Sequence, residues 1–397
     1  MAERLVITGM GAITPIGIGI EEYWNNLLAG QCGIEEIEGC DLEVKIAAQS
    51  KAFKATDYMP RKKASEMNTL LQMALVAATE AVEMSGIEHD SDRIGSVIGT
   101  ALNGFNTITE TQKKYDSSAF KRSDPRLLTK ALGNIASCHI SSEFGFKGPA
   151  MTVSTACASG GDAVTLAAMF IRSGMADAMV VSGAECGVDE ILMQSLVMTK
   201  AISPTGSRPF DKSRDGFVIG EGAGAMVIET ESHAKARGAK IIAVLAGWGN
   251  NSDGYNVVAP DPSGEGEMRC MRQALETAGI EASKVGYINA HGTSTVKGDE
   301  VELYSIGQIF DNSTMVGSTK GATGHMMGGG GITEIITCIK AVETGIIPPT
   351  TGLKDPMTDE INLVMETPVE KDIEYAMSNA FGFGCQNSSV IVGKYNE

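Results

Sequence analysis

Short apolar runs, bounded by glycine or charged residues, alternate along this chain with longer stretches of helical periodicity. Runs rich in valine and isoleucine predict buried strands, and apolar residues at helical spacing predict packed helices. Strands are expected in Arg4–Gly17, which ends in a glycine-rich bend, and in Arg93–Thr100, Ala178–Gly183, Ala225–Ile228 and from Val285 onward. Helices are expected at Glu21–Leu28, Met67–Met84 and Ala163–Ile171. This alternation predicts an α/β fold.

Three other stretches lack a clear period. Cys32–Ala55 is expected to be irregular, and Glu229–Lys240 has the composition of a charged linker. Asn103–Phe146 is long and polar, and it predicts an insertion of loops and helices.

The sequence also repeats itself. The nine residues of Glu80–Glu88 (EAVEMSGIE) are echoed by Gln273–Glu281 (QALETAGIE), and a strand is expected after each. Later, Cys157 with two following glycines and a long helix is matched by His325 with two following glycines and a long helix. The pattern predicts a duplicated α/β unit, with halves at 1–237 and 238–397 that meet near Gly238. Two equivalent strand-to-helix turns would then face one another.

Cys157 is the first candidate for chemistry. It ends a short β-branched run and precedes Ala158, Ser159 and two glycines, which leave open space before the helix. A thiolate at a helix N-terminus is stabilised by the free N–H groups there, so the position predicts a lowered pKa. A single cysteine is more often a buried structural residue, and only its partners decide between the two interpretations.

The chain has five histidines, of which two are candidates for those partners. His291 stands in YINAHGTST at a strand end, and His325 stands in the glycine-rich segment STKGATGHMMGGGG. His89, His139 and His233 lie in polar or helical surroundings and are expected to be structural or at the surface. Two histidines in glycine-rich turns, with a cysteine in the other half, favour a Cys-His-His site for covalent catalysis.

Two charged residues are candidates for support of that site. The plain interpretation of Lys320 is a solvated lysine, and the functional one is a cation that orients the site. Glu302, on the next helical stretch after His291, is a candidate to pair with it. A metal site is not expected, because neither His-x-x-x-His nor Cys-x-x-Cys spacing occurs. Gly9 and Gly11 form only two thirds of a dinucleotide-binding motif, so that interpretation is weak.

Composition narrows the class of protein. Hydrophobic residues make up 43% and aromatic residues 5% of 397, which suits aliphatic packing in two fused units. The net charge of −17 disfavours nucleic acid and anionic membranes as partners. Eight scattered cysteines and the lack of a signal peptide or long apolar run favour reduced thiols in a cytoplasm.

Six segments together resemble the β-ketoacyl-[acyl-carrier-protein] synthases, condensing enzymes of the thiolase superfamily, over essentially the whole chain. They are VITGMG at Val6–Gly11, STACASG at Ser154–Gly160, RPFDKSRDGFVIGEGAG at Arg208–Gly224, HGTST at His291–Thr295, KGATGH at Lys320–His325 and NAFGFG at Asn379–Gly384. The resemblance implies a thiolase-like, layered α-β-α-β-α fold with two mixed five-stranded sheets. It implies a decarboxylative condensation between an acyl thioester and malonyl-acyl carrier protein.

The resemblance also implies roles for single residues. Cys157 would carry the acyl group, and the backbone N–H groups of Cys157 and Phe383 would form the oxyanion hole. His291 and His325 would bind the malonyl thioester, supported by Lys320 and Glu302. Thr293 and Thr295 would contact the phosphopantetheine arm, and Phe383 would gate the acyl pocket. The arm belongs to the carrier protein, so no cofactor and no metal of the enzyme's own is implied.

Several departures from the family pattern keep alternatives open. Ser65 and Glu66 stand where a basic residue is usual, which leaves Arg61, Lys62 and Lys63 to dock a carrier protein. A homodimeric enzyme of fatty acid elongation is expected first. A ketosynthase of a polyketide or polyene pathway, paired with a related chain, is the alternative. A non-catalytic partner chain is disfavoured by the intact Cys157, and a thiolase by the pair of histidines.

Overall fold

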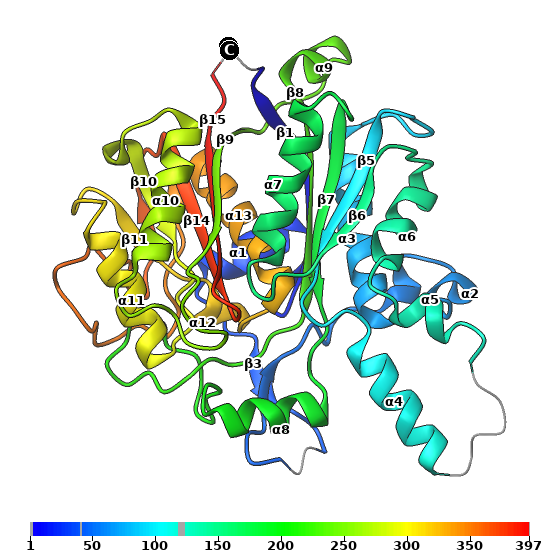
Figure 1. Cartoon of the computed structure of the whole chain (residues 1–397), viewed down its shortest axis with the longest axis horizontal. Coiled ribbons are helices and arrows are strands. Elements are labelled where there is room, and N and C mark those ends of the chain that lie inside the picture. The colour runs from blue at the N-terminus through cyan, green and yellow to red at the C-terminus, as the bar shows by residue number, and fades with distance from the viewer. Residues whose placement is uncertain (1–2, 40–41, 118–123, 397) are drawn as a thin grey trace.

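The structure is a computed structural model that describes residues 3–39, 42–117 and 124–396 (Figure 1). The strands of its main sheet are β1 (Leu5–Thr14), β2 (Gly17–Ile18), β5 (Ile94–Gly99), β6 (Ala150–Val153), β7 (Ala178–Glu185), β8 (Gly222–Thr230), β9 (Ala243–Ser252), β10 (Val285–Asn289), β11 (Met315–Gly317), β14 (Tyr375–Gly382) and β15 (Gln386–Lys394). Two small sheets pair β3 (Ile34–Glu36) with β4 (Ile46–Ala48) and β12 (Ile346–Ile347) with β13 (Val369–Glu370).

The helices are α1 (Ile20–Leu28), α2 (Arg61–Ala64), α3 (Thr69–Ser85), α4 (Phe105–Asp116), α5 (Leu127–Ala131), α6 (Ile135–Phe144), α7 (Ser159–Arg172), α8 (Glu190–Thr199), α9 (Glu231–Ala236), α10 (Glu265–Ala278), α11 (Val296–Gly307), α12 (Lys320–Thr323) and α13 (Met327–Thr344), with 3-10 turns η1 (Ala55–Asp57) and η2 (Ala282–Lys284). None of the helices in the described part of the chain is both long enough and apolar enough to cross a membrane.

The main sheet consists of two sets of five strands with the same internal pattern. Its order is β11-β10-β14-β15-β9-β1-β8-β7-β5-β6, with β2 attached to β1. From each outer edge inward, two parallel pairings are followed by two antiparallel ones. The duplication and the mixed five-stranded sets are therefore confirmed.

One feature of the sheet differs from the expectation. β1 and β9 pair through Leu5–Leu245, Val6–Val244 and Ile7–Ala243, so the two sets form one continuous sheet and are not separate sheets. Each set presents an edge strand of ten residues at the seam, and the two strands pair antiparallel, which satisfies backbone groups that would otherwise be left open. The division of the chain after residue 237 stays a prediction.

The two copies of the sequence repeat form the ends of the outer helices α3 and α10. Both end at a left-handed glycine, Gly86 and Gly279. α3 lies so close to β1 that a side-chain carbon added to Gly9 would be 2.0 Å from the carbonyl oxygen of Ala81. A carbon added to Gly249 of β9 would be 2.1 Å from the carbonyl oxygen of Cys270 in α10. The G-x-G of the first strand thus serves helix packing, which explains its incomplete nucleotide-binding motif.

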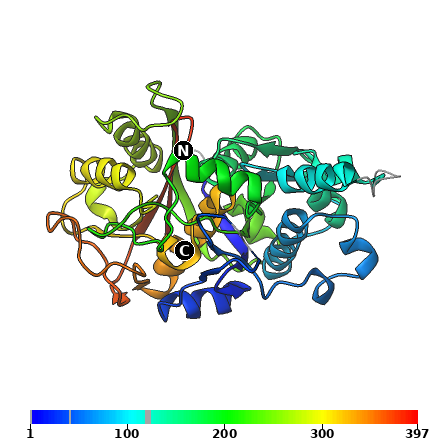
Figure 2. The same ribbon diagram turned by 90° about the horizontal axis from the view of Figure 1, so that it is seen from below.

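The inner helices α7 and α13 lie between the two sets of strands (Figure 1). They approach each other through glycine: a carbon added to Gly160 would be 2.9 Å from the backbone nitrogen of Ile332, and one added to Gly331 would be 3.0 Å from that of Gly161. Seen from below, α13 lies in the middle with the two halves to either side (Figure 2). The layers therefore run α-β-α-β-α, as expected for a thiolase-like fold.

Two stretches that the sequence left without regular structure are ordered. Cys32–Ala55 contains the antiparallel pair β3–β4, although Cys40 and Asp41 lie outside the described residues. Glu229–Lys240 contains the helix α9, which Thr230 caps by accepting a hydrogen bond from the backbone N–H of His233. The insertion 103–146 supplies α4, α5 and α6 as predicted, with 118–123 outside the described residues.

Candidate active site

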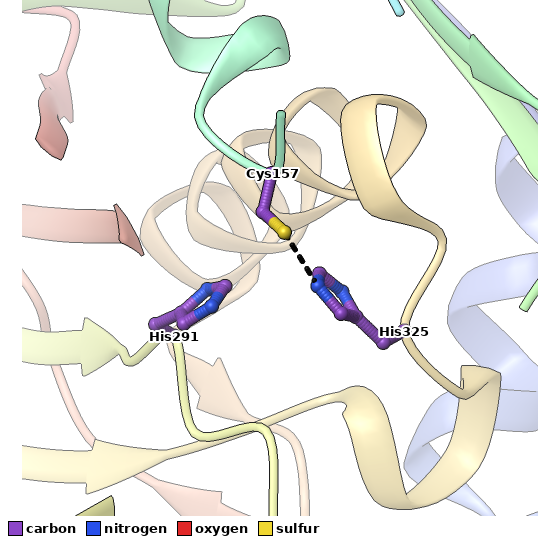
Figure 3. Close-up of side chains that lie close together, drawn as sticks. All are labelled: Cys157, His291 and His325. Atoms are coloured by element: carbon purple, nitrogen blue, oxygen red, sulfur yellow. Dashed lines mark hydrogen bonds between the residues drawn. The ribbon is translucent and has the colours of Figure 1, made fainter. Parts of the chain in front are cut away.

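Cys157 and His325 occupy equivalent places in the two halves. Each directly precedes the N-cap residue of an inner helix, Ala158 for α7 and Met326 for α13. Because the helices meet at their glycine-rich first turns, the side chains converge, and the Cys157 Sγ lies 2.9 Å from the His325 Nε2 (Figure 3). The duplication thus brings together residues that are far apart in the sequence.

His291 completes the group from the end of β10. Its ring centre lies 5.3 Å from that of His325, with the two planes nearly perpendicular. The nearest ligand atoms of Cys157, His291 and His325 all lie within 4.8 Å of one another, and Figure 3 shows the three side chains directed at a common point. The predicted Cys-His-His arrangement is therefore present as a geometry.

The turn that carries Cys157 is strained and tightly bonded. Ala156 has φ of 50°, a left-handed conformation that residues with a side chain rarely adopt. The Ser159 hydroxyl donates to the carbonyl of Ala156 (2.6 Å) and accepts from the backbone N–H of Thr155 (2.8 Å). This network fixes the sulfur at the pocket. Strain of this kind is characteristic of functional turns.

The electrostatics of Cys157 differ from the sequence prediction. Burial raises the pKa of the Cys157 thiol to about 11, although the facing backbone N–H of Phe383 and the charge of Lys320 both lower it. The predicted lowering of the pKa at the helix N-terminus is therefore wrong, because removal of the thiolate from water outweighs those contributions. Burial, with the positive charge of Lys320, also lowers the pKa of both His291 and His325 well below the ordinary value. All three groups are neutral near pH 7.

Lys320 and Glu302 lie near the site but do not pair with each other. The Lys320 ammonium group is fully buried and forms an ion pair with Glu334 of α13. Glu302 of α11 accepts hydrogen bonds of 2.7 Å from the backbone N–H groups of both His291 and Gly292. The expected Lys320–Glu302 pair is therefore wrong. Glu334 was missed because it lies in an apolar helix, where only its burial opposite a lysine marks it.

The HGTST segment that carries His291 is held mainly by acidic side chains. Asp299 accepts from the backbone N–H groups of Phe210 (2.8 Å) and Ser294 (3.0 Å). Burial raises the pKa of Asp299 and of Glu302 to about 7, against the opposing effect of these hydrogen bonds. Arg214 from the RPFDKSRDGF segment lies 3.6 Å from Asp299. That segment is thus structural support, as its paired charges indicated.

His325 is held by the end of the same segment. Its backbone N–H donates to the carbonyl of Val218 (2.7 Å), and its carbonyl accepts from Gly220 (2.9 Å). The ring of Phe217 meets the His325 ring edge-on at 5.5 Å. Sequence reasoning did not single out Phe217, and its only signal was an aromatic residue beside glycine in a segment already identified.

Cys157, His291 and His325 line one cavity of about 250 Å³. Thr293 and Thr295 lie in its wall with their hydroxyl oxygens 3.1 Å apart, and the half-exposed Phe383 stands at its edge. The remaining wall includes Phe217, Phe381, Val258 and the buried Glu267. Every predicted site residue except Lys320 therefore borders this cavity, and Lys320 lies behind it.

Cysteine and two histidines are also a ligand set that zinc accepts. Histidines that bind metal usually donate their second ring N–H to a carboxylate or carbonyl. Within the described residues, the Nδ1 atoms of His291 and His325 are both buried without a hydrogen-bond partner. The donor set therefore fits a metal poorly and suits two histidines that exchange protons.

Known proteins of one family match this chain over nearly its full length. The family model for the N-terminal domain of β-ketoacyl synthases matches residues 2–234, and that for the C-terminal domain matches 242–354. A 3-oxoacyl-[acyl-carrier-protein] synthase 2 from Vibrio harveyi is 38% identical, with 99% of each chain covered. The solved structure of the ishigamide ketosynthase/chain length factor superposes with a TM-score of 0.93 at 31% identity, covering all of both chains. A type II polyketide synthase ketosynthase in complex with its acyl-carrier protein gives a TM-score of 0.90 at 27% identity, again over all of both chains.

Proposed function

This chain belongs to the β-ketoacyl synthase family, and from that premise we propose that it joins an acyl group held on Cys157 to a malonyl unit. Malonyl-acyl carrier protein loses CO₂, and its carbanion attacks the acyl group to give β-ketoacyl-acyl carrier protein. The observation that carries the proposal is the 2.9 Å contact between the Cys157 Sγ and the His325 Nε2, with His291 beside it in one cavity. The first candidate role is fatty acid elongation.

The first half-reaction transfers the acyl group. With the thiol pKa near 11, Cys157 is not a thiolate in the resting protein. We propose that the His325 Nε2 accepts the thiol proton as sulfur attacks the thioester carbonyl, and then returns that proton to the departing thiol of the carrier arm. The developing oxyanion would receive hydrogen bonds from the backbone N–H groups of Cys157 and Phe383. Donors of this kind are each worth about 3 kcal/mol in other acyl-transfer enzymes.

The second half-reaction forms the carbon–carbon bond. Loss of CO₂ from the malonyl thioester leaves an enolate, whose oxygen His291 and His325 would stabilise by donating hydrogen bonds from Nε2. The carbanion attacks the acyl carbonyl, the bond to the Cys157 sulfur breaks, and the sulfur takes up one proton from the surroundings. Neutral imidazoles suit this step because they stabilise the enolate without readily protonating its carbon.

The tautomers of the two histidines support this sequence. His325 accepts a proton at Nε2 in the first half-reaction and donates from Nε2 in the second. Among the described residues no partner holds either Nδ1 atom, so neither tautomer is locked. We propose that this freedom lets the same ring serve both half-reactions. Neither half-reaction calls for a cofactor or a metal of the chain's own.

Partners follow from the same proposal. Thr293 and Thr295 would contact the phosphopantetheine arm of an acyl carrier protein, with Phe383 as the gate to the acyl pocket. Arg61 and Lys62 of α2 are exposed and would contact the carrier, whereas Lys63 is paired with Glu143. We propose a cytoplasmic setting, since the chemistry needs a reduced Cys157, and the seven described cysteines are all free thiols.

The test of the reaction is a condensation assay. Purified protein is mixed with a saturated acyl-carrier and malonyl-carrier, and the carrier-bound products are weighed by mass spectrometry. The proposal predicts a β-ketoacyl-carrier lengthened by two carbons, and its loss in Cys157→Ala and His325→Ala. Unchanged product in either variant would contradict the assigned roles.

A second candidate role is condensation in a polyketide or polyene pathway with a related partner chain. The match to the ishigamide ketosynthase/chain length factor supports it. The exposed apolar residues of the edge strand β6 and the insertion suit a subunit interface under either role: Ile108, Leu128, Leu132 and Met151. Light scattering of the purified chain separates the candidates. An active homodimer favours fatty acid elongation, and an inactive chain that a related subunit activates favours the second role.

A further inference from the structure

A buried carboxyl group in the wall of the cavity has no part in the reaction described above. Glu267, on the first turn of α10, is only 4% exposed and lines the same cavity as Cys157 and the two histidines. Among the described residues its Oε2 is buried without a hydrogen-bond partner. An unsatisfied polar atom is unusual at such a position, and in a residue that lines a substrate cavity it points to a missing ligand.

The surroundings of Glu267 keep it uncharged. Its charged neighbours that affect its pKa are the carboxyl groups of Glu302 and Asp253, and burial together with these charges raises the pKa of Glu267 well above the ordinary value. A side-chain hydrogen bond with Ser305 opposes that rise. Asp253 is occupied by Asn387 at 2.6 Å, and Glu302 by two backbone N–H groups. Glu267 therefore has a carboxyl proton to donate, and it lines the cavity with one carboxyl oxygen, Oε2, that has no partner among the described residues.

Glu267 belongs to the His291 side of the cavity. Its neighbour Glu302 holds the backbone of His291 and Gly292, whereas the His325 side is lined by Phe217. Thr293 and Thr295 follow His291 in the same wall. A ligand on this side would be the extender thioester rather than the acyl chain on Cys157.

We propose that Glu267 is a specificity-determining residue that donates a hydrogen bond from its free oxygen to the carboxylate of a malonyl-type extender. The inference rests on the proposed condensation, and it adds a residue that recognises the carboxylate of the extender. The thioester carbonyl of the extender is assigned to the histidines, so its carboxylate needs a separate donor. A neutral acid is suited to that task, because an ionised one would repel the carboxylate.

The test measures the two half-reactions separately. Glu267→Leu removes the donor, Glu267→Gln keeps an N–H donor of similar size, and Glu265→Leu, an exposed position two residues away, is the control. A hydrogen bond to a charged group gives roughly a tenfold or larger effect on affinity. We therefore expect Glu267→Leu to raise the KM for malonyl-carrier about tenfold with kcat within about threefold, because a ground-state contact is lost. Glu267→Gln should restore most of the affinity, and Glu265→Leu should change nothing.

Acylation of Cys157 separates failure of this inference from failure of the proposed function. All three variants should acylate at the wild-type rate. If the wild-type protein is not acylated, the proposed function fails. If Glu267→Leu acylates and condenses with an unchanged KM for malonyl-carrier, or if its KM for acyl-carrier rises equally, the inference is overturned. Should Glu267→Leu not fold, Glu267→Met, which is closer in length, is measured with the same criteria.

Discussion

The two turns that meet at the cavity occupy equivalent places in the two halves but differ in length and in the residues that they present. The turn between β6 and α7 is short, uncharged and strained at Ala156, and it presents Cys157. The turn between β11 and α13 is longer, contains α12, and presents His325 in front of the buried Lys320–Glu334 pair. In the proposed reaction, a duplicated scaffold would thus supply a nucleophile from one half and its proton acceptor from the other.

The comparison also shows how burial sets the charge state of both turns. Burial raises the pKa of the Cys157 thiol and lowers that of the His325 imidazole, so both changes favour the neutral pair over the ion pair. The charge of Lys320 lowers both pKa values, which favours the thiolate and disfavours the imidazolium. The resting thiol of Cys157 is therefore neutral, and the proposed mechanism requires its activation by His325 when substrate arrives.

The largest expected effect comes from removing the nucleophile of the first turn. Cys157→Ala should lower condensation by at least about a thousandfold, since no covalent acyl intermediate can form. Decarboxylation of malonyl-carrier should persist, because His291 and His325 remain. Release of CO₂ and formation of ketoacyl-carrier are measured in parallel. Loss of both activities in a folded variant would contradict the separate roles of the two turns.

Breaking the ion pair of the second turn should affect folding next most strongly. Lys320→Met leaves Glu334 buried and unpaired, which should cost about 3–5 kcal/mol in the free energy of unfolding. The double variant Lys320→Met/Glu334→Leu should recover most of that loss, yet acylate Cys157 more slowly because the thiol pKa rises further. Urea unfolding and acylation rates measure the two effects. Normal acylation in the double variant would show that the opposing effects of Lys320 and Glu334 on the thiol pKa cancel, against the larger effect expected of Lys320.

The contact between the turns can be tested through its glycines. In Gly160→Ala the new methyl group would meet backbone atoms of α13 at 2.9–3.1 Å, so we expect a loss of about 1–3 kcal/mol. Gly330→Ala is the matched control, because its nearest neighbour is the side chain of Glu334 at 3.4 Å. The control should be neutral or gain up to about 1 kcal/mol from helix propensity. Thermal unfolding that ranks the two variants the other way would refute the close contact.

The last prediction concerns the pH dependence of the thiol and needs no substitution. With a pKa near 11, alkylation of Cys157 by iodoacetamide should accelerate about tenfold per pH unit between pH 7 and 10. The sign follows from the raised pKa, since the reactive thiolate is a minor form that grows with pH. Peptide mapping separates Cys157 from the exposed Cys32 and Cys138. An alkylation rate that levels off near neutral pH would indicate a thiolate–imidazolium pair in the resting protein. The helix N-terminus would then have a larger effect on the thiol pKa than burial has.

The sequence predicted the parts of this site that have a local signature. The strand-to-helix position of Cys157, the glycine-rich turns of both histidines and the internal repeat could be recognised from spacing alone. The charge state of Cys157 could not, because it depends on complete burial, which only the assembled halves create. The partner of Lys320 was also misassigned, since Glu334 reaches it through the packing of α13 and not through proximity in the sequence.

Some features of the fold could not be predicted from the sequence, because they too depend on how the halves and layers pack together. The seam between β1 and β9 joins strands from different halves, and no local pattern marks which edges will pair. Gly9 and Gly11 had suggested a nucleotide loop, while their requirement comes from α3 lying on β1. In the sequence, Glu267 is one of several charged residues in an amphipathic stretch and cannot be told from its neighbours. Its place in the cavity wall is visible only in the structure.

The most direct test of the account is the intact mass of the purified protein after incubation with an acyl-carrier, before and after malonyl-carrier is added. The account predicts a gain of one acyl group that maps to Cys157 and disappears when malonyl-carrier is supplied, with a longer ketoacyl product on the carrier. A folded protein that gains no acyl group, or gains one that malonyl-carrier does not discharge, would contradict the claim that the two turns form one condensing site.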